Sequence, residues 1–349
     1  MLYQFIHATK MQILLRFHAL LLLSLMIYNL SGVKFNVLGI LFLVISCTRS
    51  SKADLSFIET ESLYARESLG RLLFFDTNLS ANKTISCASC HQPNQAFADT
   101  VAFSSGVFGR KAFRNTPSII SVKNQRLFHA DGGLPTLERQ VLAPLLDRNE
   151  LNASLKQVIQ RLKKNPNYEF LAQKAYGRPI DAFVLTRSIA AFERTLIHEG
   201  SKFDIYNSGK KSVFTSEEKR GWELFKGKLN CIACHPAPHF TTLQFEHNGL
   251  SINAKADMGR SRITGQQSDV GEFKVPSLRN CGVTAPYMHD GRFKDLKSVI
   301  NHYLSGGNNH ENQSKKIKKH QLSKKEVQVL ELFLQTLTDT VFKEKQGVY

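Results

Sequence analysis

The chain has 349 residues, enough for two domains of ordinary size. With 42% hydrophobic and 21% charged residues it has the composition of a globular protein, which excludes a disordered chain. The net charge of +17 favours acidic partner proteins or anionic lipid headgroups, and no apolar run beyond residue 50 is long enough to span a bilayer.

The first 47 residues indicate an export signal. They contain no Asp or Glu and two apolar stretches, 13–30 and 35–45, the second of which runs into Ser46 and Cys47. This pattern resembles a bacterial lipoprotein signal in which Cys47 carries the lipid, and a start at Met26 would give the signal its normal length. An uncleaved membrane anchor is the alternative. Both interpretations place the remaining chain outside the cytoplasmic membrane, in the periplasm, where nucleic acid is not an expected partner.

Two Cys-x-x-Cys-His segments carry the strongest chemical signal. Their residues are Cys87, Cys90, His91 and Cys231, Cys234, His235. Two thiols at this spacing reach the two vinyl groups of one porphyrin, and the adjoining histidine becomes an iron ligand. A single copy would also fit a zinc half-site or a redox dithiol. Two copies in an exported chain with no other Cys/His cluster predict two covalently bound haem c groups.

The flanks of the two segments repeat as well. Residues 70–74 (GRLLF) and 221–225 (GWELF) precede them in helical patterns, and the two attachment segments lie 144 positions apart. Further helices are expected at 182–197, after a capping box that begins at Thr215, and after a second capping box that begins at Ser323. No convincing strand pattern is present. We therefore expect an all-α fold of two tandem cytochrome c-like domains, 48–200 and 201–349, after the signal at 1–47.

A long block in the second half carries a family resemblance. It reads FKVPSLRN at 273–280 and continues as TAPYMHDGRF at 284–293. With the two attachment segments and their flanks, it makes the chain resemble the bacterial di-haem cytochrome c peroxidase family, which includes MauG-type enzymes, from about Ser62 to Thr338. The resemblance implies that the first haem is the peroxidatic one and that the second takes electrons from a donor.

The resemblance also implies two sets of site residues. Gln140, Pro144 and Glu150 match the spacing of the family's distal pocket, where the glutamate is catalytic. A carboxyl group whose pKa is raised by an apolar haem pocket suits proton transfer between the two oxygens of peroxide. The family's calcium site between the domains uses an asparagine and a Thr-x-Pro segment. These correspond to Asn115 and to Thr284 and Pro286.

The chain departs from the family pattern at two places before the second domain. Many members close the first haem with a loop histidine, but residues 103–115 contain none, which predicts a permanently open distal position. Many members also place a tryptophan between the haems, and here Ala130 stands at that position. Electron transfer then needs another route, for which His129 is a candidate. Trp222 is expected to lie in the core.

Three residues are candidates for the sixth ligand of the second haem. Peroxidases of the family use methionine, which raises the reduction potential, whereas MauG-type enzymes use tyrosine. Tyr303 matches the tyrosine position, and Met288 and Met258 compete with it. Cys281 has no partner and is expected to be buried, and His289 is a candidate for the lining of the second haem pocket.

These residues predict a lipid-anchored peroxidase that reduces hydrogen peroxide to water with electrons from a small donor such as cytochrome c, and a homodimer is possible. A MauG-type enzyme that oxidises an organic or protein substrate through high-valent iron is the second hypothesis. A di-haem electron carrier without enzymatic activity is the third.

Overall fold

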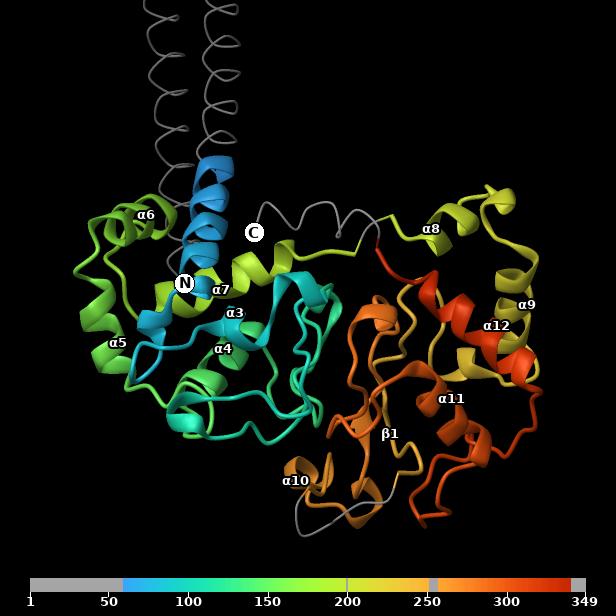
Figure 1. Cartoon of the computed structure of the whole chain (residues 1–349). Coiled ribbons are helices and arrows are strands. Elements are labelled where there is room, and N and C mark those ends of the chain that lie inside the picture. The colour runs from blue at the N-terminus through green and yellow to red at the C-terminus, as the bar shows by residue number, and fades with distance from the viewer. Residues whose placement is uncertain (1–58, 199, 251–256, 340–349) are drawn as a thin grey trace, which may run out of the picture. The chain divides into compact units, whose positions relative to one another are not determined.

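The computed structural model describes residues 59–198, 200–250 and 257–339, and Cys47 with its signal lies outside them. The described chain is mainly helical (Figure 1). A first helix covers 59–75. The helices that follow are α3 (Cys87–Cys90), α4 (Leu137–Leu146), α5 (Leu155–Leu162), α6 (Pro166–Tyr176), α7 (Ala182–Thr195), α8 (Lys202–Asn207), α9 (Ser216–Lys226), α10 (Ser261–Thr264), α11 (Leu296–Ser305) and α12 (Lys324–Gln335). Within these ranges the strands are β1 (Phe245–Glu246) and β2 (Phe273–Lys274), which pair antiparallel.

The helix starts follow the predicted capping boxes. The Thr215 hydroxyl accepts from the Glu218 N–H at 3.1 Å, and the Glu218 carboxylate accepts from the Thr215 N–H at 2.7 Å, at the start of α9. Ser323 and Glu326 do the same for α12. α7 ends at Thr195, two residues earlier than predicted, because Leu196 leaves the helical region and closes a tighter turn onto Glu193. No helix of the described ranges is long and apolar enough to cross a membrane.

The same helix crossing occurs in both halves of the sequence. A Cβ on Gly70 would stand 1.8 Å from the carbonyl oxygen of Ser188 in α7, and a Cβ on Gly221 would stand 2.1 Å from that of Val329 in α12. Phe192 and Phe333, each four residues further along, meet the same glycines. Only glycine allows backbones to approach this closely. The shared geometry supports the predicted internal repeat.

Of the hydrophobic clusters in the described chain, the two largest lie one before and one after residue 200 in the sequence. The first is built from the helix 59–75 with α4 to α7, and the second from α8, α9, α11 and α12. Trp222 packs against Phe203 and Phe333 in the second cluster, as expected for a core residue. Cys281 is 6% exposed and belongs to the same cluster. The described residues from 61 to 339 form one compact unit, so the boundary at 200 stays a prediction.

Candidate functional site

The first Cys-x-x-Cys-His segment is a single helical turn. Ser86 and Ser89 form a capping box at the start of α3, and the His91 N–H donates to the Cys87 carbonyl at 2.9 Å. His91 Nδ1 lies 3.0 Å from the carbonyl oxygen of Phe97. Because a carbonyl only accepts, Nδ1 carries the proton and the lone pair is on Nε2, the orientation that an iron ligand needs. Burial lowers the pKa of His91, which keeps the ring neutral.

The second segment repeats this arrangement. The turn Cys231–Ala233 brings the His235 N–H to 2.8 Å from the Cys231 carbonyl. His235 Nδ1 lies 3.0 Å from the Phe240 carbonyl oxygen, and burial lowers the pKa of the ring to about 4. Both histidines are therefore neutral and are held in the same tautomer by a backbone carbonyl.

The thiols of the two segments are not activated. All four are free and partly exposed. Burial raises the pKa of Cys90 to about 11 and the pKa of Cys231 to about 12. Redox dithiols have lowered thiol pKa values, so these thiols fit thioether bonds to haem better than dithiol chemistry. In the parts of the chain that the structure describes, no three His, Cys, Asp or Glu side chains are grouped so that they could hold a metal ion.

Glu150 lies in the turn that follows α4. Its N–H donates to the Asp147 carbonyl at 3.1 Å, and no side chain of the described ranges hydrogen-bonds its carboxyl group. Burial raises the pKa of Glu150 to about 7, and the nearby Asp147 charge adds to the effect. The Glu150 charge in turn raises the pKa of both Cys87 and Cys90. The structure thus brings this carboxyl group close to the first attachment segment.

Gln140 and Pro144 lie in α4 itself. They are one helical turn apart, on a half-buried face beside the buried residues Val141 and Leu145. The Pro144 carbonyl accepts from the Leu151 N–H at 3.1 Å, which bends the chain after α4 back toward the helix. No hydrogen bond joins the side chains of Gln140 and Glu150 within the described chain. The backbone of α4 and its closing turn connects them.

Tyr303 and Met288 both lie beside Asn248. Burial raises the pKa of Tyr303 to about 12, with smaller contributions from the charges of Cys234 and Cys231, and a hydrogen bond with Asn248 lowers it. The Asn248 amide donates to Met288 Sδ at 3.4 Å. Met258 and Tyr303 are each 36% exposed. The pKa effect places Tyr303 near the second pair of thiols, and because methionine does not ionise it leaves both methionines as candidates.

Asn115 lies where the first half of the chain contacts the second. Its N–H donates to the His289 carbonyl at 2.8 Å, and its side-chain amide donates to the Val101 carbonyl at 3.1 Å. Thr284 is half-buried and Pro286 is buried, and both precede His289 by a few residues. The structure thus brings Asn115 beside the segment that contains both residues.

Arg114, beside Asn115, was not predicted from the sequence. Arg114 pairs with Asp257 through Nε at 2.7 Å and Nη2 at 2.8 Å, and with Asp131 through Nη1 at 2.8 Å. The backbone near Ala130 is held as well, because the Lys274 N–H donates to the Ala130 carbonyl at 2.7 Å. Nothing in the spacing of these residues in the sequence signals the cluster.

Two histidines that the sequence singled out, His289 and His129, lie near the contact between the two halves of the chain. The His289 ring stacks on Phe273 with centroids 4.1 Å apart, and the Arg114 guanidinium lies 5.3 Å above the same phenylalanine ring. His129 has a left-handed backbone (φ 65°), and its pKa is lowered by burial and by nearby charges that include Lys274 of the second half. Both histidines therefore lie near the contact between the two halves of the sequence.

A second missed residue is Glu193 in α7. Its side chain is buried, Oε2 has no hydrogen-bond partner, and burial raises its pKa to about 8. Its charge raises the pKa of Cys87. An acidic residue beside Ile189 and Phe192 on the apolar face of the predicted helix is the signal that could have found it.

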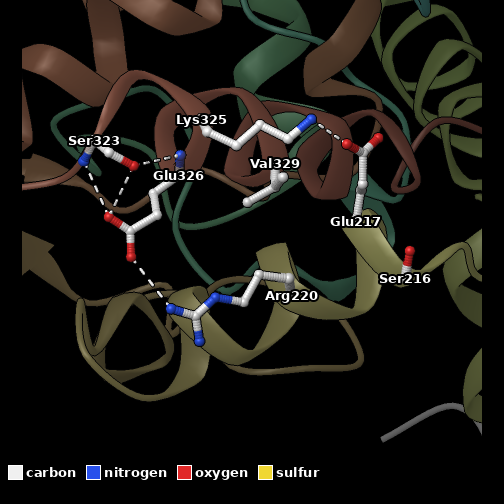
Figure 2. A pocket seen from close by; sticks show the side chains of 7 residues that line it. All are labelled: Ser216, Glu217, Arg220, Ser323, Lys325, Glu326 and Val329. Carbon is white, nitrogen blue, oxygen red and sulfur yellow. Dashed lines mark hydrogen bonds and ion pairs between the residues drawn. The ribbon is translucent and has the colours of Figure 1, made fainter.

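A shallow pocket lies away from the residues described above, and none of the candidate catalytic residues lines it. It is lined by α9 and by the start of α12, and Figure 2 shows that its charged side chains face one another. Lys325 pairs with Glu217, and Arg220 pairs with Glu326 at 3.2 Å. The two histidines and Glu150 do not line it.

Two Cys-x-x-Cys-His segments with oriented histidines, in a mainly helical chain, define a c-type haem protein. The family described as "Di-haem cytochrome c peroxidase" matches residues 64–212. "Methylamine utilization protein MauG" of Methylorubrum extorquens is 36% identical over 274 residues, 77% of each chain. "Cytochrome c551 peroxidase" of Nitrosomonas europaea is 31% identical over 277 residues, 77% of this chain and 79% of its own. The chain belongs to the di-haem cytochrome c peroxidase family and is an oxidoreductase.

A solved structure agrees with this assignment. It is titled "Crystal structure of a MauG-like protein associated with microbial copper homeostasis" and superposes with a TM-score of 0.76 at 33% identity. The match covers 80% of this chain and 91% of that one. The described fold is therefore the fold of this family.

Proposed function

We propose that this protein is an exported di-haem peroxidase that reduces hydrogen peroxide to water with electrons from an external donor such as cytochrome c. The observation that carries the proposal is the Glu150 carboxyl group. It lies near Cys87 and Cys90, and its pKa is about 7. No side chain of the described residues forms a hydrogen bond with it. A group with this pKa can both accept and return a proton at neutral pH.

The two attachment segments would hold the haems. His91 and His235 present Nε2 for iron, and their cysteine pairs present thiols for the thioether bonds, in two tandem cytochrome c domains at 48–200 and 201–349. When bound, the haems supply the iron at which peroxide is reduced and the path by which electrons arrive. Two electrons and two protons convert one peroxide into two waters.

Glu150 would move the proton that breaking the O–O bond requires. Its carboxylate accepts the proton of one peroxide oxygen and returns it to the other, which leaves as water. Gln140 would orient the peroxide by a hydrogen bond from its amide, and Pro144 would shape the same wall. Both lie on the face of α4 beside its buried residues.

Steady-state turnover separates this function from its rivals. With reduced cytochrome c as the sole reductant, we expect two cytochromes oxidised for each peroxide consumed. Turnover that needs an organic or protein substrate instead would establish the MauG-type alternative. No turnover with any reductant would leave an electron carrier.

One observation favours the MauG-type alternative. Tyr303 lies close enough to Cys231 and Cys234 for their charges to affect its pKa, as a tyrosine ligand of the second haem would. The relatives named MauG, and the MauG-like structure, share this fold. A tyrosine ligand lowers the reduction potential and disfavours easy reduction by a donor.

The ligand can be tested by Tyr303→Met. If Tyr303 is the sixth ligand, we expect the potential of the second haem to rise by on the order of 100 mV, within the ~0.8 V range that axial ligands span. A potentiometric titration measures it. The same titration of Met258→Leu tests the third candidate. An unchanged potential in Tyr303→Met, together with a shift in Met288→Leu, would assign the ligand to Met288.

We also propose a calcium ion held by Asn115, Thr284 and Pro286. The Asn115 amide nitrogen donates to backbone carbonyls, which leaves its oxygen available as a hard ligand, and Thr284 and Pro286 would contribute backbone carbonyls. Chelation should lower peroxide turnover several-fold, and added calcium should restore it. Asn115→Ala should be insensitive to both. Equal turnover of the native protein with and without chelator would contradict the site.

The remaining proposals concern location and assembly. A lipid on Cys47 would anchor the protein in the periplasm, the compartment of the proposed donor. The protein would act alone or as a homodimer.

A further inference from the structure

A short hairpin packs directly on the backbone of Glu150. Residues 104–112 form this hairpin. The Gly106 N–H donates to the Arg110 carbonyl at 2.8 Å, and the Ala112 N–H donates to the Ser104 carbonyl at 3.0 Å. At its turn the Val107 N–H donates to the Glu150 carbonyl at 2.9 Å. This is the stretch that contains no histidine.

Gly106 makes the closest approach. A Cβ there would stand 1.9 Å from the carbonyl oxygen of Asn149 and 2.9 Å from the Cα of Glu150. Both atoms belong to the backbone, so no side-chain rotation can relieve the overlap. Gly106 itself has an extended backbone (φ −84°), so glycine is needed here for space rather than for conformation.

The opposite side of Glu150 is held by the end of α4. The Glu150 and Asn152 N–H groups both donate to the Asp147 carbonyl, and the Ala153 N–H donates to the Leu145 carbonyl at 2.7 Å. The Glu150 backbone is thus clasped between this turn and the hairpin. Its side chain has no hydrogen bond to the described residues, so the hydrogen bonds that position this residue are those of its backbone.

The titratable and charged groups around Glu150 come from its own turn, from the first attachment segment and from the hairpin. Asp147 in its own turn raises its pKa, and Cys87 and Cys90 respond to its charge. The hairpin contributes Arg110, which donates to the Arg148 carbonyl at 2.8 Å and lies over the Phe108 ring. Arg110 is therefore engaged on the hairpin side.

We infer that Gly106 is a positioning residue: it lets the hairpin 104–112 hold Glu150 in its working place in the resting protein. The inference rests on the proposed role of Glu150. It agrees with the open distal position that the absence of histidine from residues 103–115 predicts. The carboxyl group is already held beside the first attachment segment by two independent sets of backbone contacts.

The test is cyanide binding to the ferric holoprotein. Hydrogen cyanide must give its proton to a nearby base when cyanide binds iron, so the binding rate reports the Glu150 carboxylate without peroxide turnover. In the native protein we expect the rate to rise with pH through about 7. Gly106→Ala should slow binding by about 10- to 100-fold, because displacements of about 1 Å carry costs of that order.

Gly109→Ala is the matched control on the same hairpin. A Cβ there meets nothing within 4 Å, but φ +71° strains any side chain, so this variant disturbs the hairpin without touching Glu150. We expect native cyanide binding from it. In a Glu150→Gln background, Gly106→Ala should add nothing, because both changes act through one carboxyl group.

A second variant protects the test against misfolding. Val107→Pro removes the N–H that bonds the Glu150 carbonyl and replaces the buried Val107 side chain with a ring of similar size, at a turn position that suits proline. It should slow cyanide binding like Gly106→Ala. Native binding in both variants, or additive effects with Glu150→Gln, would overturn the inference. Loss of peroxide turnover is a separate measurement, so the proposed function can fail while the positioning result stands.

Discussion

Replacing Glu150 with glutamine should lower peroxide turnover by roughly 10²- to 10⁴-fold, the contribution typical of a positioned acid–base group. Glutamine keeps the shape and the polar end of the side chain but cannot accept a proton. Because burial opposes the charged form of Glu150 and no described side chain hydrogen-bonds its carboxyl group, the neutral glutamine should leave the haem absorption spectrum unchanged and should not lower the melting temperature. Stopped-flow mixing with peroxide, followed at the haem absorption bands, measures the effect.

The pH dependence gives a sharper version of this result. Glu150 accepts a proton only when ionised, and its pKa is about 7, so kcat/KM of the native protein should rise as pH increases through 7. The variant should lack this step. Asp147→Asn removes the neighbouring charge that raises the pKa of Glu150, so its profile should move to lower pH at an unchanged maximum. A Glu150→Gln protein with native turnover would remove the basis of the proposed function.

The two helix crossings predict the largest stability losses. Gly70→Ala and Gly221→Ala should each lower the free energy of unfolding by about 3 kcal/mol or more, because the new Cβ meets a backbone carbonyl. If the halves are separate domains, Gly70→Ala should lower the unfolding temperature of the first and Gly221→Ala that of the second. Calorimetry of the holoprotein would resolve the two transitions.

A glycine in open space is the control for these variants. A Cβ on Gly177, after α6, would meet nothing within 4 Å, and only its left-handed φ of +65° opposes alanine. Gly177→Ala should therefore cost about 1 to 2 kcal/mol. Gly70 and Gly221 have no left-handed φ, so a loss in their variants no larger than that of Gly177→Ala would contradict the close helix contact.

Local sequence patterns predicted the helices well because their signals are local. Thr215 and Ser323 each have a glutamate three residues later, and both reciprocal caps form. The end of α7 was predicted less well. Apolar spacing continues through Ile197, whereas Leu196 turns out of the helix to pack in the core.

In the candidate site, too, local patterns were predictable and long-range contacts were not. The attachment segments follow from adjacent residues, and the proximity of Glu150 to Cys87 agrees with the role that the family resemblance implies. Gly106 could not be predicted, because its importance comes from a contact with Asn149 across 43 residues of chain. The same is true of Arg114, whose partner Asp257 is 143 residues away.

The Arg114 pairing joins two parts of the chain that are synthesised at different times. When the first part is complete, the guanidinium has Asp131 as a partner, while Asp257 has yet to be made. The contacts of Arg114 with Asp257 and with the Phe273 ring form only when the second part folds. A product cut short before residue 257 would lack these contacts, and we expect proteases to cleave it faster than the full chain.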